Sequence, residues 1–211
     1  MTGKTEALPP LSIQSPNPLL IVISGPSGVG KDSVLEVMKS RGLPFHFVIT
    51  ATTRAPRADE VDGVDYFFLT QDEFARMIDE GELLEYAVVY KDYKGIPKSQ
   101  VREALASGKN VIMRIDVQGA ETVRELAEDA LLIFLTPQNE EELINRLKKR
   151  DTETKESLKL RIATTRQEYN KIDLFDYIVV NKDDRLSETV DIIEAIIQAE
   201  QHRVHQRVVN L

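Results

Sequence analysis

A glycine-rich segment that ends in a lysine is the part of the chain most suited to chemistry. Residues 25 to 31 read Gly-Pro-Ser-Gly-Val-Gly-Lys and directly follow the apolar run from Leu19 to Ile23. Glycines let backbone N–H groups converge on phosphate oxygens, and the positive N-terminal end of a following helix favours the same anion. Lys31 adds a cation that reaches the outer phosphates. A turn that only connects a strand to a helix needs no lysine at this spacing, so the pattern predicts a nucleotide-binding loop.

Asp32 follows this lysine, where the pattern normally has a serine or threonine that ligates Mg²⁺. A carboxylate is also a hard oxygen ligand, which binds Mg²⁺ directly or through water. Its negative charge equally opposes phosphate binding. Both interpretations stay open, and both place Asp32 and the next residue, Ser33, in the phosphate site.

A second segment suited to anion binding reads Thr-Thr-Arg-Ala-Pro-Arg at residues 52 to 57. Pro56 fixes its own backbone torsion and favours extended geometry at Ala55, so the loop is stiff and holds Arg54 and Arg57 near each other. Neighbouring guanidinium groups repel unless an anion lies between them, and each matches the geometry of a phosphate. Two solvated surface arginines are the alternative. The position of Arg54 and Arg57 directly after a strand favours a second phosphate site.

Two acidic residues lie in or directly after strands, where their side chains could bind the edge of a nucleobase. Glu85 lies within an apolar strand pattern and Asp116 follows another. A solvated strand-end acid or a paired structural charge is the simpler interpretation. Guanine, however, presents two N–H donors on its pairing edge, and one buried carboxylate accepts both, whereas adenine presents an acceptor there. Glu85 is therefore a candidate for selective guanine recognition.

The elements that must position these residues alternate between strand and helix patterns. Most of the apolar segments are nearly continuous, which is typical of strands buried on both faces of a parallel sheet. The expected strands are 19–24, 45–49, 111–115, 131–135 and 177–180. The expected helices are 33–40, 120–127, 140–149, 156–170 and 188–205. This alternation predicts an α/β fold with three layers.

Two stretches interrupt this alternation. Residues 50–97 contain strand patterns at 66–68 and 84–90 with a capped helix start at Thr70, which predicts an inserted α+β lobe. A second, strongly charged helical insertion covers about 138–165. The core is then expected in 19–49, 98–137 and 166–211, after a flexible proline-containing tail at 1–18.

The overall composition narrows the classes of function. The chain has 211 residues, a formal net charge of −8 and no cysteine. An acidic protein is a poor sequence-independent binder of nucleic acid, so an anionic ligand must be held by local positive groups. The lack of cysteine excludes disulfides, thiolate metal sites and a cysteine nucleophile, and it is compatible with a reducing compartment. We expect neither a membrane span nor a secretion signal.

These motifs together resemble the guanylate kinase family, whose members phosphorylate GMP with ATP. The resemblance extends from about Leu19 to Arg207, and it depends on the order and spacing of several stretches rather than on any one of them. The matching stretches are 25–31, 52–57, Glu60 through Gly63 to 65–66, 115–119 and 180–181. The resemblance implies a P-loop NTPase fold with a parallel core, a GMP-binding lobe at 50–97 and a mobile helical lid at about 138–165.

The resemblance also implies roles for individual residues. The ATP-binding residues would be Gly25, Pro26, Ser27, Gly28, Val29, Gly30, Lys31, Asp32, Ser33 and Asn181, the last beside adenine. The GMP-binding residues would be Thr50, Arg54, Arg57, Tyr66, Glu85, Lys94 and Asp116. The catalytic cations would be Lys31, Arg150 and Arg161, supported by Arg146. The implied cofactor is Mg²⁺ bound with ATP, and the implied setting is cytoplasmic, with ATP and GMP as partners and neither nucleic acid nor membrane. The oligomeric state stays open.

Several positions depart from the family pattern. Lys94 replaces a tyrosine that binds phosphate, and Ile96 replaces a hydroxyl that contacts guanine. Arg114 stands where many members have an acid, while Asp32 adds an acid in the phosphate loop. We hypothesise that these last two changes compensate each other.

Three other functions remain as alternatives. The chain would otherwise be a non-catalytic interaction module of the same family, a related kinase with another phosphorylated acceptor, or a P-loop switch or ATPase. The retained Lys31 speaks against the first, and the arginine pair speaks against the last. The changes at Lys94 and Ile96 keep the second open.

Overall fold

A parallel five-stranded sheet forms the centre of the molecule. The computed structural model describes residues 15–89, 91–148 and 155–211. The strand order is β2-β7-β1-β8-β9, and every neighbouring pair is parallel. The strands are β1 (Leu20–Ser24), β2 (Phe45–Phe47), β7 (Asn110–Arg114), β8 (Leu131–Thr136) and β9 (Tyr177–Val180). All the strands expected in the core are thereby confirmed.

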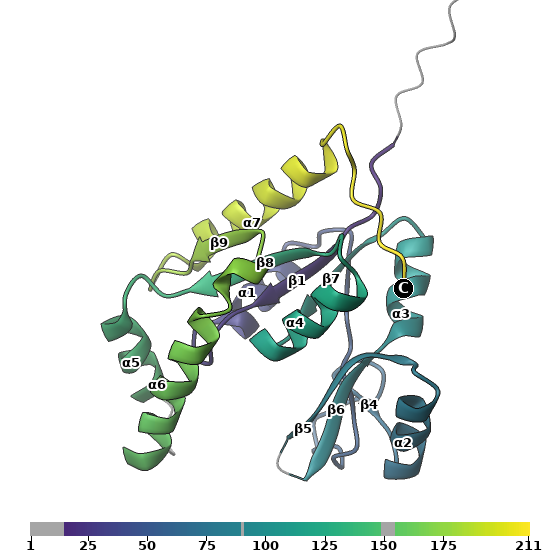
Figure 1. Ribbon diagram of the computed structural model, residues 1–211, viewed down its shortest axis with the longest axis horizontal. Helices are drawn as coiled ribbons and strands as arrows, with labels where there is room; N and C mark the ends of the chain where they lie inside the picture. Colours follow the sequence, from purple (N-terminus) through teal and green to yellow (C-terminus); the bar gives the residue numbers. More distant parts are fainter. Residues whose placement is uncertain (1–14, 90, 149–154) are drawn as a thin grey trace, which may run out of the picture.

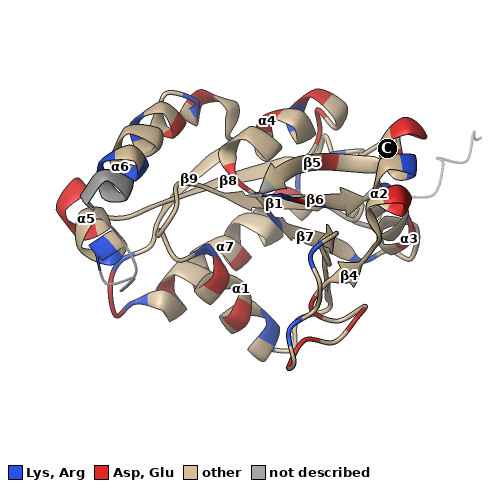
Figure 2. Cartoon of the chain, turned by 90° about the horizontal axis from the view of Figure 1, so that it is seen from below, with Lys and Arg blue, Asp and Glu red and all other residues tan. Residues whose placement is uncertain are grey.

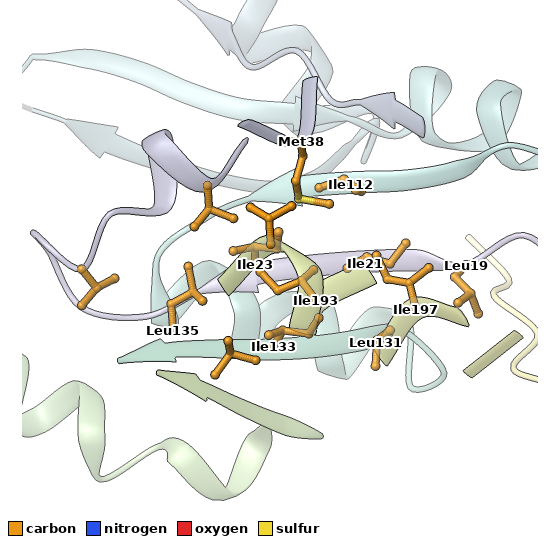
Figure 3. Close-up of a cluster of buried hydrophobic side chains, with 14 of the residues drawn as sticks. Leu19, Ile21, Ile23, Met38, Ile112, Leu131, Ile133, Leu135, Ile193 and Ile197 are labelled. Atoms are coloured by element: carbon orange, nitrogen blue, oxygen red, sulfur yellow. The ribbon is translucent and has the colours of Figure 1, made fainter. Parts of the chain in front are cut away.

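Helices cover both faces of this sheet and complete three layers (Figure 1). Helices α1 (Lys31–Ser40) and α7 (Leu186–Gln201) pack on one face, and α3 (Lys98–Ala106) and α4 (Val117–Leu126) on the other. Along β1, Ile21 and Ile23 contribute to the first face and Leu20 and Val22 to the second. Figure 3 shows the first cluster, in which strand side chains meet Met38 of α1 and Ile193 of α7. Burial on both faces explains why the strand segments are continuously apolar.

The inserted lobe is built around a second sheet of four strands in the order β4-β3-β6-β5. Its elements are β3 (Ala51–Thr52), β4 (Phe67–Phe68), α2 (Gln71–Asp79), β5 (Leu83–Val89) and β6 (Asp92–Pro97). Helix α2 begins with a full capping box between Thr70 and Glu73, as the sequence predicts. Phe74 of α2 stacks on Tyr93 of β6 with 5.2 Å between ring centroids, and this contact helps to fix the helix on the sheet.

Two charged helices form the second insertion, α5 (Glu140–Lys148) and α6 (Lys155–Tyr169), and the short 3₁₀ helix η1 (Ile172–Leu174) leads from α6 to β9. The Asn139 side chain caps α5, because its Oδ1 accepts the N–H of Glu142 at 2.8 Å. In Figure 1 this pair of helices and the lobe extend from the same side of the core. Figure 2 views the molecule from that side and shows charged residues on both extensions.

The sequence did not predict α3, β3 or β6. The N-cap of α3 is Pro97, which makes no side-chain capping bond, so no helix-start signal is present. Strand β3 has two residues and β6 contains Gly95 and Pro97, so both lack a strand-like pattern. Most of the expected tail lies outside the described residues, and the backbone N–H of Asn17 donates to Gln206 at 2.8 Å. Across the described part of the chain, no helix has the length and apolar character needed to cross a bilayer.

Candidate functional site

The glycine-rich loop between β1 and α1 has a backbone that other residues cannot adopt easily. Gly25 has φ 136°, and a Cβ atom there would lie 2.2 Å from the backbone oxygen of Leu135. Gly30 has φ 92° and is the N-cap of α1, with no side-chain capping bond. The first N–H groups of α1 are thus not occupied by a side-chain cap, which suits an anion.

Lys31 is held inside this loop. Its Nζ donates to the carbonyl oxygens of Gly25 and Pro26, the second at 3.0 Å. Burial lowers the pKa of Lys31 to about 8, although the negative charge of Glu168 opposes this effect. A half-buried cation beside a helix start that has no side-chain cap suits a multiply charged anion, which is what the sequence pattern predicts.

A cavity of about 690 Å³ opens over the loop. Its lining includes the predicted residues Ser27, Gly28, Val29, Gly30, Lys31, Asp32, Ser33 and Asn181, together with Arg114, Asp116, Arg146 and Glu168. Gly25 and Pro26 lie buried behind it. Burial raises the pKa of Glu168, an acid of α6 that sequence reasoning missed. Only the packing of α6 brings this helical acid to the loop, and no local pattern marks it.

Two side chains brace the loop from the side of α5 and β9. The amide of Asn181 donates to the carbonyl of Val29 at 2.8 Å and accepts from the hydroxyl of Thr189 at 3.0 Å. Arg146 donates to the carbonyls of Val29 and Asn181 at 3.1 and 2.7 Å, and to Asp183 at 2.9 Å. These bonds tie the loop to α5 and to the residue that follows β9.

Of the arginines expected from the second insertion, Arg161 reaches the loop. Its Nη1 lies 3.4 Å from the hydroxyl oxygen of Ser27, which joins α6 to the phosphate-binding segment. Arg150 lies outside the described residues.

A second cavity of about 240 Å³ lies between the core and the lobe. Its lining consists of Lys31, Thr50, Tyr66, Glu85, Ala87, Lys94, Arg114, Ile115 and Asp116. The structure therefore brings together residues that the sequence separates by more than sixty positions, among them the predicted Thr50, Tyr66, Glu85, Lys94 and Asp116. Ile96 does not line this cavity and is buried in the core cluster beside α3.

Glu85 is the most perturbed carboxyl group of this second cavity. Burial, with a smaller effect from Asp116, raises the pKa of Glu85 to about 7. Gly119 in the first turn of α4 lies so close that a Cβ atom there would be 3.2 Å from Oε2 of Glu85. Asp116 caps the same helix by accepting the N–H of Gly119 at 2.8 Å. The carboxyl groups of Glu85 and Asp116 thus both lie against the start of α4.

The predicted residues Arg54 and Arg57 are not among those that line this cavity, and an acid of their own loop anchors them. The two terminal nitrogens of Arg54 donate to the two carboxylate oxygens of Glu60 at 2.9 and 2.8 Å, and the backbone N–H of Arg57 donates to Glu60 at 2.8 Å. The Arg54 guanidinium lies 5.3 Å from the ring centre of Tyr66, and Nζ of Lys94 lies 5.4 Å from it. Glu60 was part of the sequence resemblance without a role, and its position three residues after Arg57 is the only local signal for one.

The two cavities adjoin, because Lys31, Arg114 and Asp116 line both. At this junction Arg114 forms an ion pair with Asp32. The two residues that depart together from the family pattern are therefore in direct contact, which is what a compensating change requires. A parallel α/β sheet with a phosphate-binding loop and a second adjoining cavity defines a P-loop nucleotide-binding protein.

Comparison with known proteins narrows this class. A sequence model described as guanylate kinase matches residues 17–200. Guanylate kinase 2, chloroplastic/mitochondrial, of Oryza sativa subsp. japonica is 50% identical over 210 residues, covering 99% of this chain and 73% of that protein. The guanylate kinase of Clostridium perfringens strain 13 is 47% identical over 193 residues, covering 92% and 88%. The crystal structure of guanylate kinase from Anaplasma phagocytophilum superposes with a TM-score of 0.69 at 27% identity and 92% coverage of each chain. The chain belongs to the guanylate kinase family.

Proposed function

We propose that this protein transfers the γ-phosphoryl group of ATP to GMP, giving ADP and GDP. The observation that carries the proposal is the pair of adjoining cavities, one on the phosphate-binding loop and one at the lobe, with Lys31 in the wall of both. A kinase must hold two anions face to face, and neither an ATPase nor a switch needs the second cavity. Sequence relatives of this length and identity support the same reaction.

ATP is assigned to the larger cavity. Its volume of about 690 Å³ lies in the range of small-molecule sites. The loop amides and Lys31 bind the phosphates, and the wall formed by Asn181 and Arg146 receives the adenine end. Because both ends of the Asn181 amide already bond within the protein, its first contribution is to hold the loop in shape.

GMP is assigned to the smaller cavity. Ionised Glu85 accepts the two N–H donors of guanine, with Asp116 beside it and Thr50 near the base. Arg54, Arg57, Tyr66 and Lys94 hold the phosphate. Since Glu60 anchors both arginine positions, the phosphate site is organised before the substrate arrives.

The chemistry requires positioning and charge neutralisation more than proton transfer, because the ionised phosphate of GMP is already a nucleophile. Lys31 and Arg161 neutralise charge on the transferring group, and we assign Arg150 to the same task from the family resemblance. Closure of the lobe and the α5–α6 lid excludes water and so protects ATP from hydrolysis.

The residues present fit Mg²⁺ bound together with ATP. Mg²⁺ usually takes one or two carboxylates and completes its shell with water and phosphate oxygens. Asp32 lines the ATP cavity and its side chain is 59% exposed, so it would hold the ion directly or through water even while paired with Arg114. An ion held there would supply positive charge that neutralises the phosphates of ATP.

A coupled assay for ADP release tests the proposal, with ATP and each nucleoside monophosphate in turn as acceptor. Strong preference for GMP is the expected result. No ADP release with any acceptor would favour a non-catalytic module, and preference for AMP would favour a related kinase.

The absence of cysteine is compatible with the cytoplasmic setting that we assign to this reaction.

A further inference from the structure

Arg114 occupies the junction of the proposed donor and acceptor cavities. It ends β7, beside the strand that leads into the phosphate-binding loop. Its side chain lines the 690 Å³ cavity, the 240 Å³ cavity and a third, polar cavity of about 170 Å³ that also contains Asp32 and Tyr66. A side chain at this place would be close to the phosphates of both proposed substrates, ATP and GMP.

The Asp32 contact uses only part of the hydrogen-bonding capacity of Arg114. A guanidinium carries five N–H donors. Nη1 donates to Oδ1 of Asp32, and the other donors have no hydrogen-bond partner within residues 15–89, 91–148 and 155–211. The Arg114 side chain is 36% exposed, so these donors are not sealed in the core. They are available to a ligand in the cavities.

Lys31, Lys94 and Arg114 share the wall of the smaller cavity with the acids Glu85 and Asp116. Arg114 and Lys31 line the same two cavities, so their positive charges lie near each other. Among the described residues Arg114 pairs with Asp32 at the start of α1, so its positive charge offsets the repulsion between that carboxylate and a phosphate. Two cations that share a cavity wall are stabilised by a multiply charged anion between them.

We propose that Arg114 is a catalytic residue that binds the phosphate of the acceptor nucleotide where it faces the donor, and that Asp32 is the positioning residue that holds its guanidinium there. The proposal rests on the function proposed above, and it assigns to this chain an arginine at a position where many family members have an acid. The occupant is the phosphate monoester group, not the base or the ribose.

The rival explanation is that Arg114 only neutralises Asp32. The effect of R114M, measured once in the wild type and once in the D32S variant, separates the two explanations. Equilibrium titration without ATP measures the affinity for GMP and for guanosine, which lacks the phosphate, in the wild type, R114M, D32S and the R114M/D32S double variant. R114K tests whether a cation without the planar fork suffices, and Arg102→Met on α3 is the matched control for loss of a surface arginine.

If Arg114 binds the phosphate, R114M weakens GMP binding by roughly 10- to 100-fold and leaves guanosine binding within about twofold, as expected for loss of a charge-assisted hydrogen bond. The same substitution in the D32S background still weakens GMP binding by more than about threefold. Turnover with ATP falls by roughly 10²-fold in both backgrounds.

The proposal is overturned if R114M binds GMP with wild-type affinity. It is also overturned if adding R114M to D32S changes the GMP dissociation constant by no more than about threefold. Equal weakening of GMP and guanosine binding also overturns it, because the defect is then not specific to phosphate. Thermal unfolding of each variant, with R114K as the conservative substitution, separates these results from misfolding. A wild type that binds GMP but forms no ADP contradicts the proposed function, and this outcome is read independently of the Arg114 variants.

Discussion

In the proposed function, the phosphate-binding loop and the acceptor cavity would recognise anions in different ways. The loop relies on backbone: glycines with positive φ, a helix start with no side-chain cap, and one lysine tied to loop carbonyls. The proposed acceptor cavity relies on side chains drawn from the lobe and the core. Arg54, which lies over the ring of the lining residue Tyr66, is paired with Glu60 in advance. Recognition by backbone suits the triphosphate group, which is a common ligand of P-loop nucleotide-binding proteins. Side-chain recognition suits the substrate that sets one protein apart from another.

This difference predicts where each region is vulnerable. The donor loop should be intolerant of change at its single lysine, because the backbone cannot supply another full positive charge. The acceptor cavity should divide its task, with carboxylates that determine which base is accepted and cations that determine how tightly its phosphate is held.

The largest effect is expected for Lys31→Ala. Loss of a preorganised cation that contacts the transferring group costs about 3 kcal/mol of transition-state stabilisation or more, so turnover should fall by at least roughly 10²-fold. Steady-state kinetics measures the loss, and circular dichroism checks that the fold is intact. Lys39→Ala, an exposed lysine on the same helix, is the control. Near-normal turnover in Lys31→Ala would remove this residue from the mechanism.

Glu85→Gln should weaken the preference for guanine over adenine while leaving the binding of ATP unchanged. The amide no longer accepts both N–H donors of guanine, and hydrogen bonds to a charged group are worth roughly 1.5–3 kcal/mol. The ratio of kcat/KM for GMP to that for AMP should fall by about 30-fold, with the KM for ATP unchanged. Glu82→Gln, just before the same strand, is the control. Unchanged discrimination would refute the assignment of Glu85 to guanine.

The same carboxyl group predicts a pH dependence confined to the acceptor cavity. Because burial places the pKa of Glu85 at about 7, lowering the pH protonates it and removes the form that binds guanine. Between about pH 8 and about pH 6 the guanosine dissociation constant should rise about tenfold. Guanosine is the probe because it has no titrating phosphate. A pH-independent constant in the wild type, or an equally steep dependence in Glu85→Gln, would contradict this prediction.

Lys94→Met tests whether the cation of β6 acts on the phosphate. Nζ of Lys94 lies beside the ring of Tyr66 near Arg54, so we expect the GMP dissociation constant to rise about tenfold while guanosine binding changes little. Lys91→Met, an exposed lysine close by, is the control. A matching loss for guanosine would show that Lys94 acts on cavity shape instead.

The smallest effect concerns stability in the absence of nucleotide. A carboxyl group whose pKa is raised on folding stabilises the fold below its unfolded pKa, and this contribution is lost as the pH rises through the folded value of about 7. Charging buried Glu85 then costs on the order of 1–3 kcal/mol, so at about pH 8 Glu85→Gln should raise Tm by a few degrees. The gain should disappear near about pH 4, where both side chains are neutral. An equal or lower Tm for the variant at the higher pH would indicate that burial does not strain this carboxylate.

Local signals in the sequence were sufficient for the core strands, the capped helix starts and the donor loop. The short, continuous apolar runs of β1 and β8 favour strands buried on both faces, and Thr70 and Asn139 mark helix starts through their own hydrogen bonds. The loop from Gly25 to Lys31 is equally local, since its function follows from the backbone freedom of glycine and the helix that comes next. The residues assigned to GMP came largely from the resemblance to a family, and their roles stay predictions that the variants above test.

The sequence by itself determined the parallel α/β core and the phosphate-binding loop, because strand burial, capping and glycine conformation depend on neighbours in the chain. Tertiary structure alone decided that Arg114 pairs with Asp32 and that Glu168 of α6 reaches the loop. Both contacts join residues far apart in the sequence. The energy of a charge depends on the burial and the partners that such packing creates, and no local pattern records either.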